Sequence, residues 1–311
     1  MSNWKIKVLV QFILAHVPFG EQLNHSLQRL HRREEARKKG ITDELPKLGT
    51  AITMIRNHIV LRGASVVEVG TGWVPLPTTL LYLAGARRIL TYDHVRHVRF
   101  ELVREMLDVF VGLPRELSEI LDVPEEQIKS KLAGLCSADN LEHFLSLAGI
   151  EYVAPGDAAA TGEPEGSVDL FFSYAVLEHV SEKVLDALVK ESRRLLRPGG
   201  CFYAYIGLHD HYAGFDKRIS KVNFLRYPEW VWRLFVKNKI SYHNRLRLRE
   251  FVERLEGCGG SIKEIRSIVD PEDIARVRSM NVDRRFEHFS PEECAVTTAE
   301  IVANFPARIQ G

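Results

Sequence analysis

The sequence predicts an α/β fold built on a mostly parallel sheet, and the first evidence lies in residues 65–92. A run of β-branched residues predicts a strand over 65–69, a helical pattern follows over about 77–84, and a second strand is expected over 88–92. Strand, helix and strand within about 30 residues make up a βαβ unit, whose two strands run parallel.

The second observation is that the alternation of strands and helices continues to the end of the chain. With the first two strands, the later ones bring the predicted total to seven. A sheet of this kind is covered by helices on both faces. The later strands are expected at 151–153, 168–172, 201–206, 261–269 and 294–303. Between them, Ser181 is a predicted N-cap, and Val184, Leu185, Leu188 and Leu195 are a predicted core face of the helix that it starts.

Length and composition agree with a globular protein. The chain has 311 residues, of which 45% are hydrophobic and 27% charged. The 42 basic and 41 acidic residues nearly cancel, so the net charge does not favour nucleic acid as a partner. Four cysteines without a CxxC spacing indicate neither a zinc site nor a disulfide framework, and they favour a reducing cytoplasm. They are Cys136, Cys201, Cys258 and Cys294.

The chain divides into an N-terminal helical extension, 1–48, and a main domain, 49–311. The apolar run 8–15 is too short to span a bilayer. A basic run in the extension favours a solvated helix face, with contact to an anionic membrane surface as the alternative. This run consists of Arg29, Arg32, Arg33, Arg37, Lys38 and Lys39.

Two insertions interrupt the main domain. Residues 95–149 are predicted to form several short helices, because apolar residues recur at helical spacing and prolines stand at helix starts. Residues 208–243 are rich in aromatic residues and arginine. Together with the following Asn244–Arg247 segment, they could form a lid that stacks or clamps an acceptor, or equally the packing core of the insertion.

The segment Glu68–Trp73 joins the first strand to the first helix at the carboxyl edge of the sheet, where open α/β sheets bind ligands. Gly70 and Gly72 allow a tight turn and let a ligand approach the backbone. An ordinary βα turn without a ligand is the alternative interpretation.

Asp93 ends the second strand, where an acid can accept hydrogen bonds from both ribose hydroxyls of a nucleoside. A helix cap is its alternative role. A dinucleotide fingerprint would require Gly or Ala at position 75, and Pro75 stands there instead. A nicotinamide-dependent oxidoreductase is therefore the weaker alternative, beside a non-catalytic cofactor-binding protein.

These motifs resemble those of class I S-adenosylmethionine-dependent methyltransferases over roughly 50–207 and 246–305. The stretch 168–179 and the segment Leu196–Gly200 are similar to the broad type 11 group, whereas Val74 departs from a third glycine common in the family. The resemblance implies a Rossmann-like fold, S-adenosylmethionine as cofactor, and a cofactor site formed by Glu68, Gly70, Thr71, Gly72, Asp93, Asp157, Ala158 and Ser173.

The acceptor side is expected after the fifth strand, at His209, Asp210 and His211. A histidine titrates near neutral pH and could take a proton from a hydroxyl acceptor, while Asp210 could orient it or bind a metal. A polar loop that caps the sheet is the alternative, and no metal site is predicted. We expect direct in-line transfer to a small-molecule, sugar or lipid-linked acceptor, and a structural role for His179 beside the cofactor.

Overall fold

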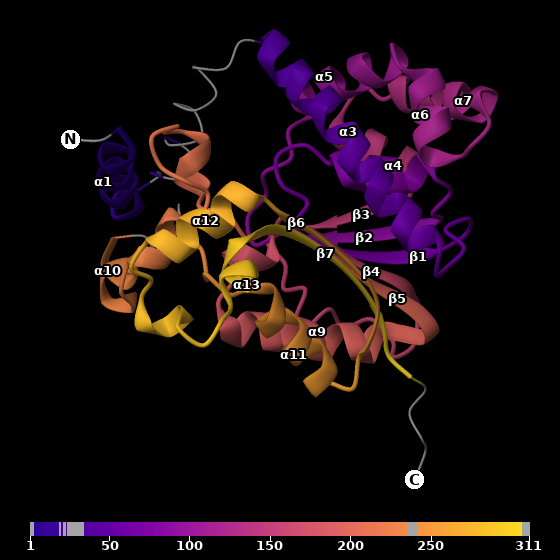
Figure 1. Cartoon of the computed structure of the whole chain (residues 1–311). Helices are drawn as coiled ribbons and strands as arrows, with labels where there is room; N and C mark the ends of the chain where they lie inside the picture. The colour runs from indigo at the N-terminus through magenta and orange to yellow at the C-terminus, as the bar shows by residue number, and fades with distance from the viewer. Residues whose placement is uncertain are drawn as a thin grey trace.

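A seven-stranded sheet forms the centre of the protein (Figure 1). The strand order is β3-β2-β1-β4-β5-β7-β6. The computed structural model describes residues 3–18, 20, 23, 34–235, 240 and 242–306. The strands are β1 (Ser65–Val69), β2 (Arg88–Tyr92), β3 (Ile150–Val153), β4 (Val168–Tyr174), β5 (Leu196–Gly207), β6 (Ser261–Val269) and β7 (Val296–Asn304).

The predicted α/β fold with a mostly parallel sheet is confirmed. β1 pairs in parallel with β2 on one side and with β4 on the other. Only β7 runs against its neighbours, pairing antiparallel with both β5 and β6. All five residues of β1 are buried, as in a strand covered on both faces, which is why they read as a continuous β-branched run.

Helices cover both faces of the sheet (Figure 1). Val66 packs into the core on the side of α3 and α4, while Val67, the next residue, packs into the core on the side of α9 and α11. Ser181 caps α9 as predicted, but Val184 is 42% exposed, because it lies beside the stripe formed by Leu185, Leu188 and Leu195. The bounds are α3 (Glu34–Arg56), α4 (Leu76–Leu83), α9 (Glu182–Leu195) and α11 (Leu248–Gly257).

The boundary expected between residues 48 and 49 is wrong, because it falls inside α3 (Glu34–Arg56). The buried stripe of this helix runs from Ile41 through Leu48 to Ile55 without a break, so α3 belongs to the core of the domain. Arg29, Arg32 and Arg33 lie outside the described residues. In the described part of the chain, no helix combines the length and apolarity needed to cross a membrane.

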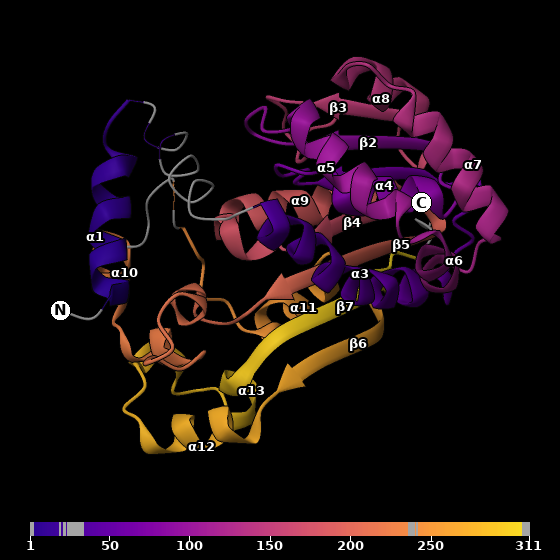
Figure 2. The same ribbon diagram turned by 90° about the horizontal axis from the view of Figure 1, so that it is seen from above.

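The two predicted insertions differ in structure. Residues 95–149 contain four helices that pack on α3 and beside β3: α5 (Phe100–Val111), α6 (Pro114–Leu121), α7 (Glu125–Cys136) and α8 (Leu141–Leu147). Residues 208–243 hold short helices that pack into a separate apolar core with α12 (Pro271–Ser279) and α13 (Pro291–Ala295). These are η2 (His211–Gly214), η3 (Asn223–Arg226) and α10 (Glu229–Phe235). Figure 2 shows α10 beside α1 (Asn3–Ala15), at one end of the molecule.

Candidate functional site

The turn after β1 requires its two glycines for different reasons. Gly70 has φ +85°, and a Cβ there would overlap the side chain of Val176. Gly72 has φ +69° and open space around its α-carbon, so only the left-handed backbone demands glycine. The open space leaves the backbone of the turn approachable, as a ligand-binding loop needs.

Glu68 lies beneath this turn and is 1% exposed. One carboxylate oxygen, Oε2, accepts hydrogen bonds from Thr78 Oγ1 at 2.5 Å and Thr91 Oγ1 at 2.6 Å. Burial outweighs these hydrogen bonds and raises the pKa of Glu68 to about 7. Thr71 joins the network through Thr91, at 2.6 Å between their hydroxyl oxygens. The network fixes the turn to β2 and α4.

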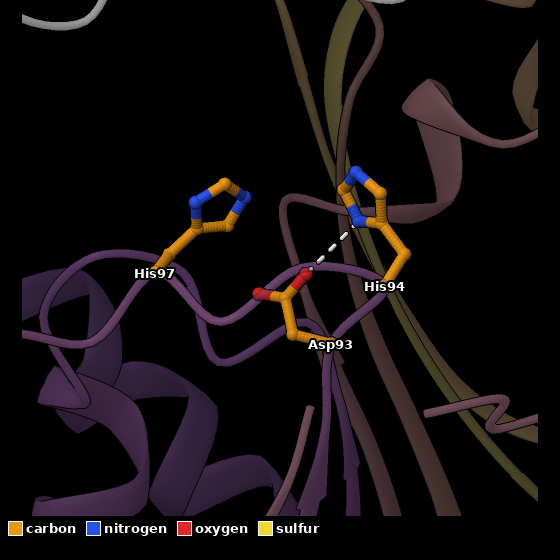
Figure 3. Close-up of side chains that lie close together, drawn as sticks. All are labelled: Asp93, His94 and His97. Atoms are coloured by element: carbon orange, nitrogen blue, oxygen red, sulfur yellow. Dashed lines mark hydrogen bonds and ion pairs between the residues drawn. The ribbon is translucent and has the colours of Figure 1, made fainter. Parts of the chain in front are cut away.

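Asp93 lies at the end of β2, directly across from the turn. Its Oδ2 accepts a hydrogen bond from the Gly72 amide at 3.0 Å, and its Oδ1 lies 3.0 Å from Nδ1 of His94. Burial alone would raise the pKa of Asp93, but the hydrogen bonds from His94 and Gly72 hold it below its usual range, so the carboxylate is ionised. Figure 3 shows Asp93 between the rings of His94 and His97.

A cavity of about 730 Å³ opens at this edge of the sheet. Four of the predicted cofactor residues line it: Gly70, Thr71, Gly72 and Asp93. Trp73 and Val74 extend the same wall. The cavity therefore lies at the carboxyl ends of β1, β2 and β4, where this class of sheet binds ligands.

The other predicted cofactor residues do not line the cavity, namely Glu68, Asp157, Ala158 and Ser173. Asp157 is exposed and accepts a hydrogen bond from the amide of Ala159 at 2.8 Å, while Ala158 is buried. Ser173 is fully buried in β4. Gly156 ties the loop after β3 to the site, since its amide donates to the carbonyl of Asp93 at 2.8 Å.

The far wall of the cavity includes Glu44 and Tyr174, which the sequence did not single out for it. Glu44 of α3 accepts a hydrogen bond from the hydroxyl of Tyr174 at 2.6 Å, which joins the helix to the end of β4. Both line the cavity, together with His179 of η1 (Leu177–His179). A Glu-His pair after the fourth strand was a visible signal for His179, but no local pattern marks Glu44.

His209, Asp210 and His211 lie behind this wall and do not line the cavity. Asp210 is a cap: its carboxylate accepts from the amide of Tyr212 at 2.9 Å and from Asn223 Nδ2 at 3.1 Å. Burial raises the pKa of Asp210 to about 6, whereas burial lowers the pKa of His209. His211 lies beside His179, with ring centroids 4.9 Å apart. Of the three predicted residues, His211 therefore contacts a residue that lines the cavity, although it does not line the cavity itself.

The arginines after the second insertion are packing residues. Arg245 is fully buried, pairs with Glu229 at 2.6 Å and lies over the ring of Trp232. Arg247 is also fully buried and donates to the carbonyls of Leu208, Cys294 and Val296. Of the two interpretations of this segment, the structure supports the packing core for both arginines.

Comparison with known proteins supports the class that the sequence motifs indicate. Residues 128–204 match a family model described as a methyltransferase domain. The match covers α7 to β5 and confirms the resemblance to class I S-adenosylmethionine-dependent methyltransferases. S-adenosylmethionine is accordingly the cofactor. No curated protein has a sequence that matches this chain.

Several solved structures are similar in fold. One is a chain of the complex between a Haloferax volcanii methyltransferase activator and a methyltransferase (17% identity, 89% of this chain, 96% of that chain, TM-score 0.44). Another is an S-adenosylmethionine-dependent methyltransferase from Mesorhizobium loti (16% identity, 81% of this chain, 95% of that chain, TM-score 0.44). A third is geranyl diphosphate C-methyltransferase from Streptomyces coelicolor A3(2), in complex with Mg²⁺, geranyl diphosphate and S-adenosylhomocysteine (15% identity, 88% of this chain, 85% of that chain, TM-score 0.45). At these values none of them identifies the acceptor of this chain.

Proposed function

We propose that this chain transfers the methyl group of S-adenosylmethionine to a small-molecule, sugar or lipid-linked acceptor by direct in-line displacement. The observation that carries the proposal is the cavity of about 730 Å³, which the glycine turn, Asp93, Tyr174 and His179 all line. In this proposal, the glycine turn and Asp93 form the cofactor end, and Tyr174 and His179 form the acceptor end. A volume of this order holds a cofactor and part of a small acceptor. The sulfonium supplies an activated methyl group, and the chain supplies position and shelter from water.

At the cofactor end, Asp93 is the proposed ribose acid. Its carboxylate is ionised and lies at the cavity wall, as acceptance of two hydroxyl hydrogen bonds requires. Gly70 and Gly72 would let the methionine portion approach the backbone, with Glu68 and Thr71 holding the turn in shape. Asp157, Ala158 and Ser173 stay proposals for the adenine side, on the strength of the family resemblance alone.

At the acceptor end, a histidine is the proposed proton acceptor for a hydroxyl acceptor. His179 is best placed, because it lines the cavity. Its Nδ1 lies 2.8 Å from the carbonyl of Tyr242, which fixes the proton on Nδ1 and leaves the lone pair on Nε2. His209 and His211 are the second choice, since they reach the cavity only past His179.

Calorimetry with the full chain tests the proposal. S-adenosylhomocysteine is expected to bind at one site, and NAD is expected not to bind, because Pro75 and Pro77 remove amide donors from the start of α4 where a pyrophosphate would bind. Binding of NAD alone would identify the oxidoreductase instead. Cofactor binding without turnover on any hydroxyl, amine or carbon acceptor class would favour the non-catalytic protein.

Contact with a membrane surface is the proposed role of α1, the first helix of the predicted N-terminal extension. The domain is proposed to lie in a reducing cytoplasm, where its four free thiols persist. Helix α1 has no acidic residue, and Ile6, Leu9 and Ile13 are each about half exposed. Trp230 of the neighbouring α10 is 67% exposed. Exposed apolar side chains beside Lys5 suit an anionic bilayer. Co-sedimentation with vesicles of anionic lipid is expected, and an Ile6→Ser/Ile13→Ser variant is expected to stay in solution.

A further inference from the structure

Glu178, His179 and His211 form a cluster at the acceptor end of the cavity. Glu178 and His179 are consecutive residues of η1, and His211 begins η2. One ligand atom from each lies within 4.8 Å of those of the other two. We propose that these three residues bind a divalent transition-metal ion of the zinc type.

The strongest evidence is the carboxylate of Glu178, a residue that is 1% exposed. Its Oε1 accepts a hydrogen bond from the amide of Gly207 at 2.9 Å. Its Oε2 is buried and has no hydrogen-bond partner among the described residues. An unpaired buried carboxylate oxygen is costly, and a cation that binds it removes that cost.

Each of the two histidines offers one ring nitrogen to the cluster. His179 donates from Nδ1 to the carbonyl of Tyr242, so its Nε2 is the ligand atom. A backbone carbonyl that orients an imidazole in this way is the usual support of a metal-binding histidine. His211 makes no hydrogen bond to any residue in the described part of the chain, and its side chain is exposed.

Two neighbouring histidines have different roles. His243 is excluded as a ligand, because its Nδ1 accepts from the amide of Arg245 at 3.2 Å and its Nε2 then donates to the carbonyl of Gly207 at 3.3 Å. His209 contacts the cluster only through His211, with the two ring centroids 4.9 Å apart, and its Nδ1 lies 3.3 Å from the carbonyl of Thr297. His209 is therefore a neighbour of the site rather than part of the set.

The ligand types select the metal. Imidazole nitrogens with one carboxylate suit zinc and similar ions, whereas magnesium and calcium prefer oxygen ligands. Three protein ligands leave a coordination position open, and His179 lines the cavity, so the open position can take an acceptor oxygen. This last step rests on the proposed function, but metal binding does not. With the ion bound, the lone pair of His179 is engaged, and the ion instead lowers the pKa of a bound hydroxyl.

A second cluster, formed by Asp93, His94 and His97, provides a matched control. Its ligand atoms also lie within 4.8 Å of one another. However, each oxygen of Asp93 already accepts a hydrogen bond, from Gly72 or His94, so neither is an orphaned buried oxygen like Oε2 of Glu178. We therefore expect zinc to prefer the Glu178 cluster.

The test is titration of Zn²⁺ into chelator-treated full-length protein, against a chromophoric chelator, with Co²⁺ absorption as a second readout. One equivalent is expected to bind. His211→Ala and Glu178→Gln are each expected to weaken zinc binding by at least about 10-fold and to change the Co²⁺ spectrum. His94→Ala is expected to bind zinc like the unchanged chain.

His211 is exposed, so its alanine variant is expected to fold even if Glu178→Gln does not, and retained S-adenosylhomocysteine binding verifies folding. Zinc affinity that is the same in His211→Ala as in the unchanged chain, or that is lost in His94→Ala instead, overturns the proposal. Zinc binding by a chain that fails to bind S-adenosylhomocysteine would contradict the proposed function and leave the metal site standing.

Discussion

The two ends of the cavity are built in different ways. The cofactor end comes from one stretch of chain, the β1 turn and the end of β2, whose residues bond to one another through Glu68, Thr91 and Asp93. The acceptor end brings together α3, the end of β4 and η1, and the loop after β5 packs against it through His211 and His179. A single βαβ unit thus creates the cofactor end, whereas the acceptor end depends on the packing of the whole domain.

The largest expected effect tests whether the buried Arg247 stabilises the fold around the acceptor end. Arg247→Met leaves the carbonyls of Leu208, Cys294 and Val296 without their donor, although the methionine keeps most of the apolar contact. Three lost hydrogen bonds from a charged group predict a loss of roughly 3–5 kcal/mol in the free energy of unfolding. Urea unfolding measures it, with the half-buried Arg249→Met as control. Equal stability of the two variants would show that the arginine network is dispensable.

The next effect concerns the buried carboxyl group at the cofactor end. Glu68 keeps its proton up to about pH 7 in the folded chain, but releases it near its ordinary pKa of 4.5 when unfolded. The folded state binds more protons in this window, so its stability contribution is full below pH 4.5 and decreases as pH rises to 7, by about 3 kcal/mol. Glu68→Gln resembles the protonated form and should flatten this part of the stability profile. A profile that the substitution leaves unchanged would contradict the buried-acid account.

A smaller effect is expected at the glycine turn. Gly70→Ala combines a left-handed φ with overlap against Val176 and should destabilise the chain by about 2 kcal/mol, besides weakening cofactor binding. Gly134→Ala is the control, since Gly134 lies in α7 with nothing within 4 Å of a Cβ, and helix propensity predicts a small gain. Thermal unfolding compares the two. If Gly70→Ala were as stable as Gly134→Ala, the turn after β1 would not require glycine at position 70.

The smallest effect concerns the hydrogen bond between β4 and α3 at the acceptor end of the cavity. Tyr174→Phe removes the hydrogen bond to Glu44 that joins α3 to β4, at a cost of about 1 kcal/mol. We expect weaker acceptor binding with unchanged affinity for S-adenosylhomocysteine. Tyr82→Phe on α4 is the control, because the hydroxyl of Tyr82 has no described hydrogen-bond partner. A loss of cofactor affinity in Tyr174→Phe would mean that the two ends are not separate.

Local patterns in the sequence were enough to predict the sheet and to select four residues that line the cavity. Strand β1 matches its predicted bounds because a parallel strand, buried on both faces, reads as an unbroken apolar run. Gly70, Gly72 and Asp93 line one cavity because the carboxyl ends of parallel strands meet at one edge, and their binding of the cofactor stays a prediction.

The acceptor end could not be predicted in the same way. Glu44 and Tyr174 are 130 residues apart in the chain, and only the packing of α3 on the sheet brings them together. Nothing local distinguishes Arg247, which binds buried carbonyls, from an arginine that could clamp an acceptor. His211 was selected for its chemistry, but its position behind His179 depends on how two loops meet.

The central claim is that cofactor and acceptor are held by separate ends of one cavity. The most direct test is the dissociation constant of S-adenosylhomocysteine for Asp93→Ala and His179→Ala, measured by calorimetry beside the unchanged chain. Loss of two hydrogen bonds to a charged group predicts roughly 100-fold weaker binding for Asp93→Ala, and His179→Ala should stay within about threefold. Equal losses in the two variants, or a loss confined to His179→Ala, would contradict this account.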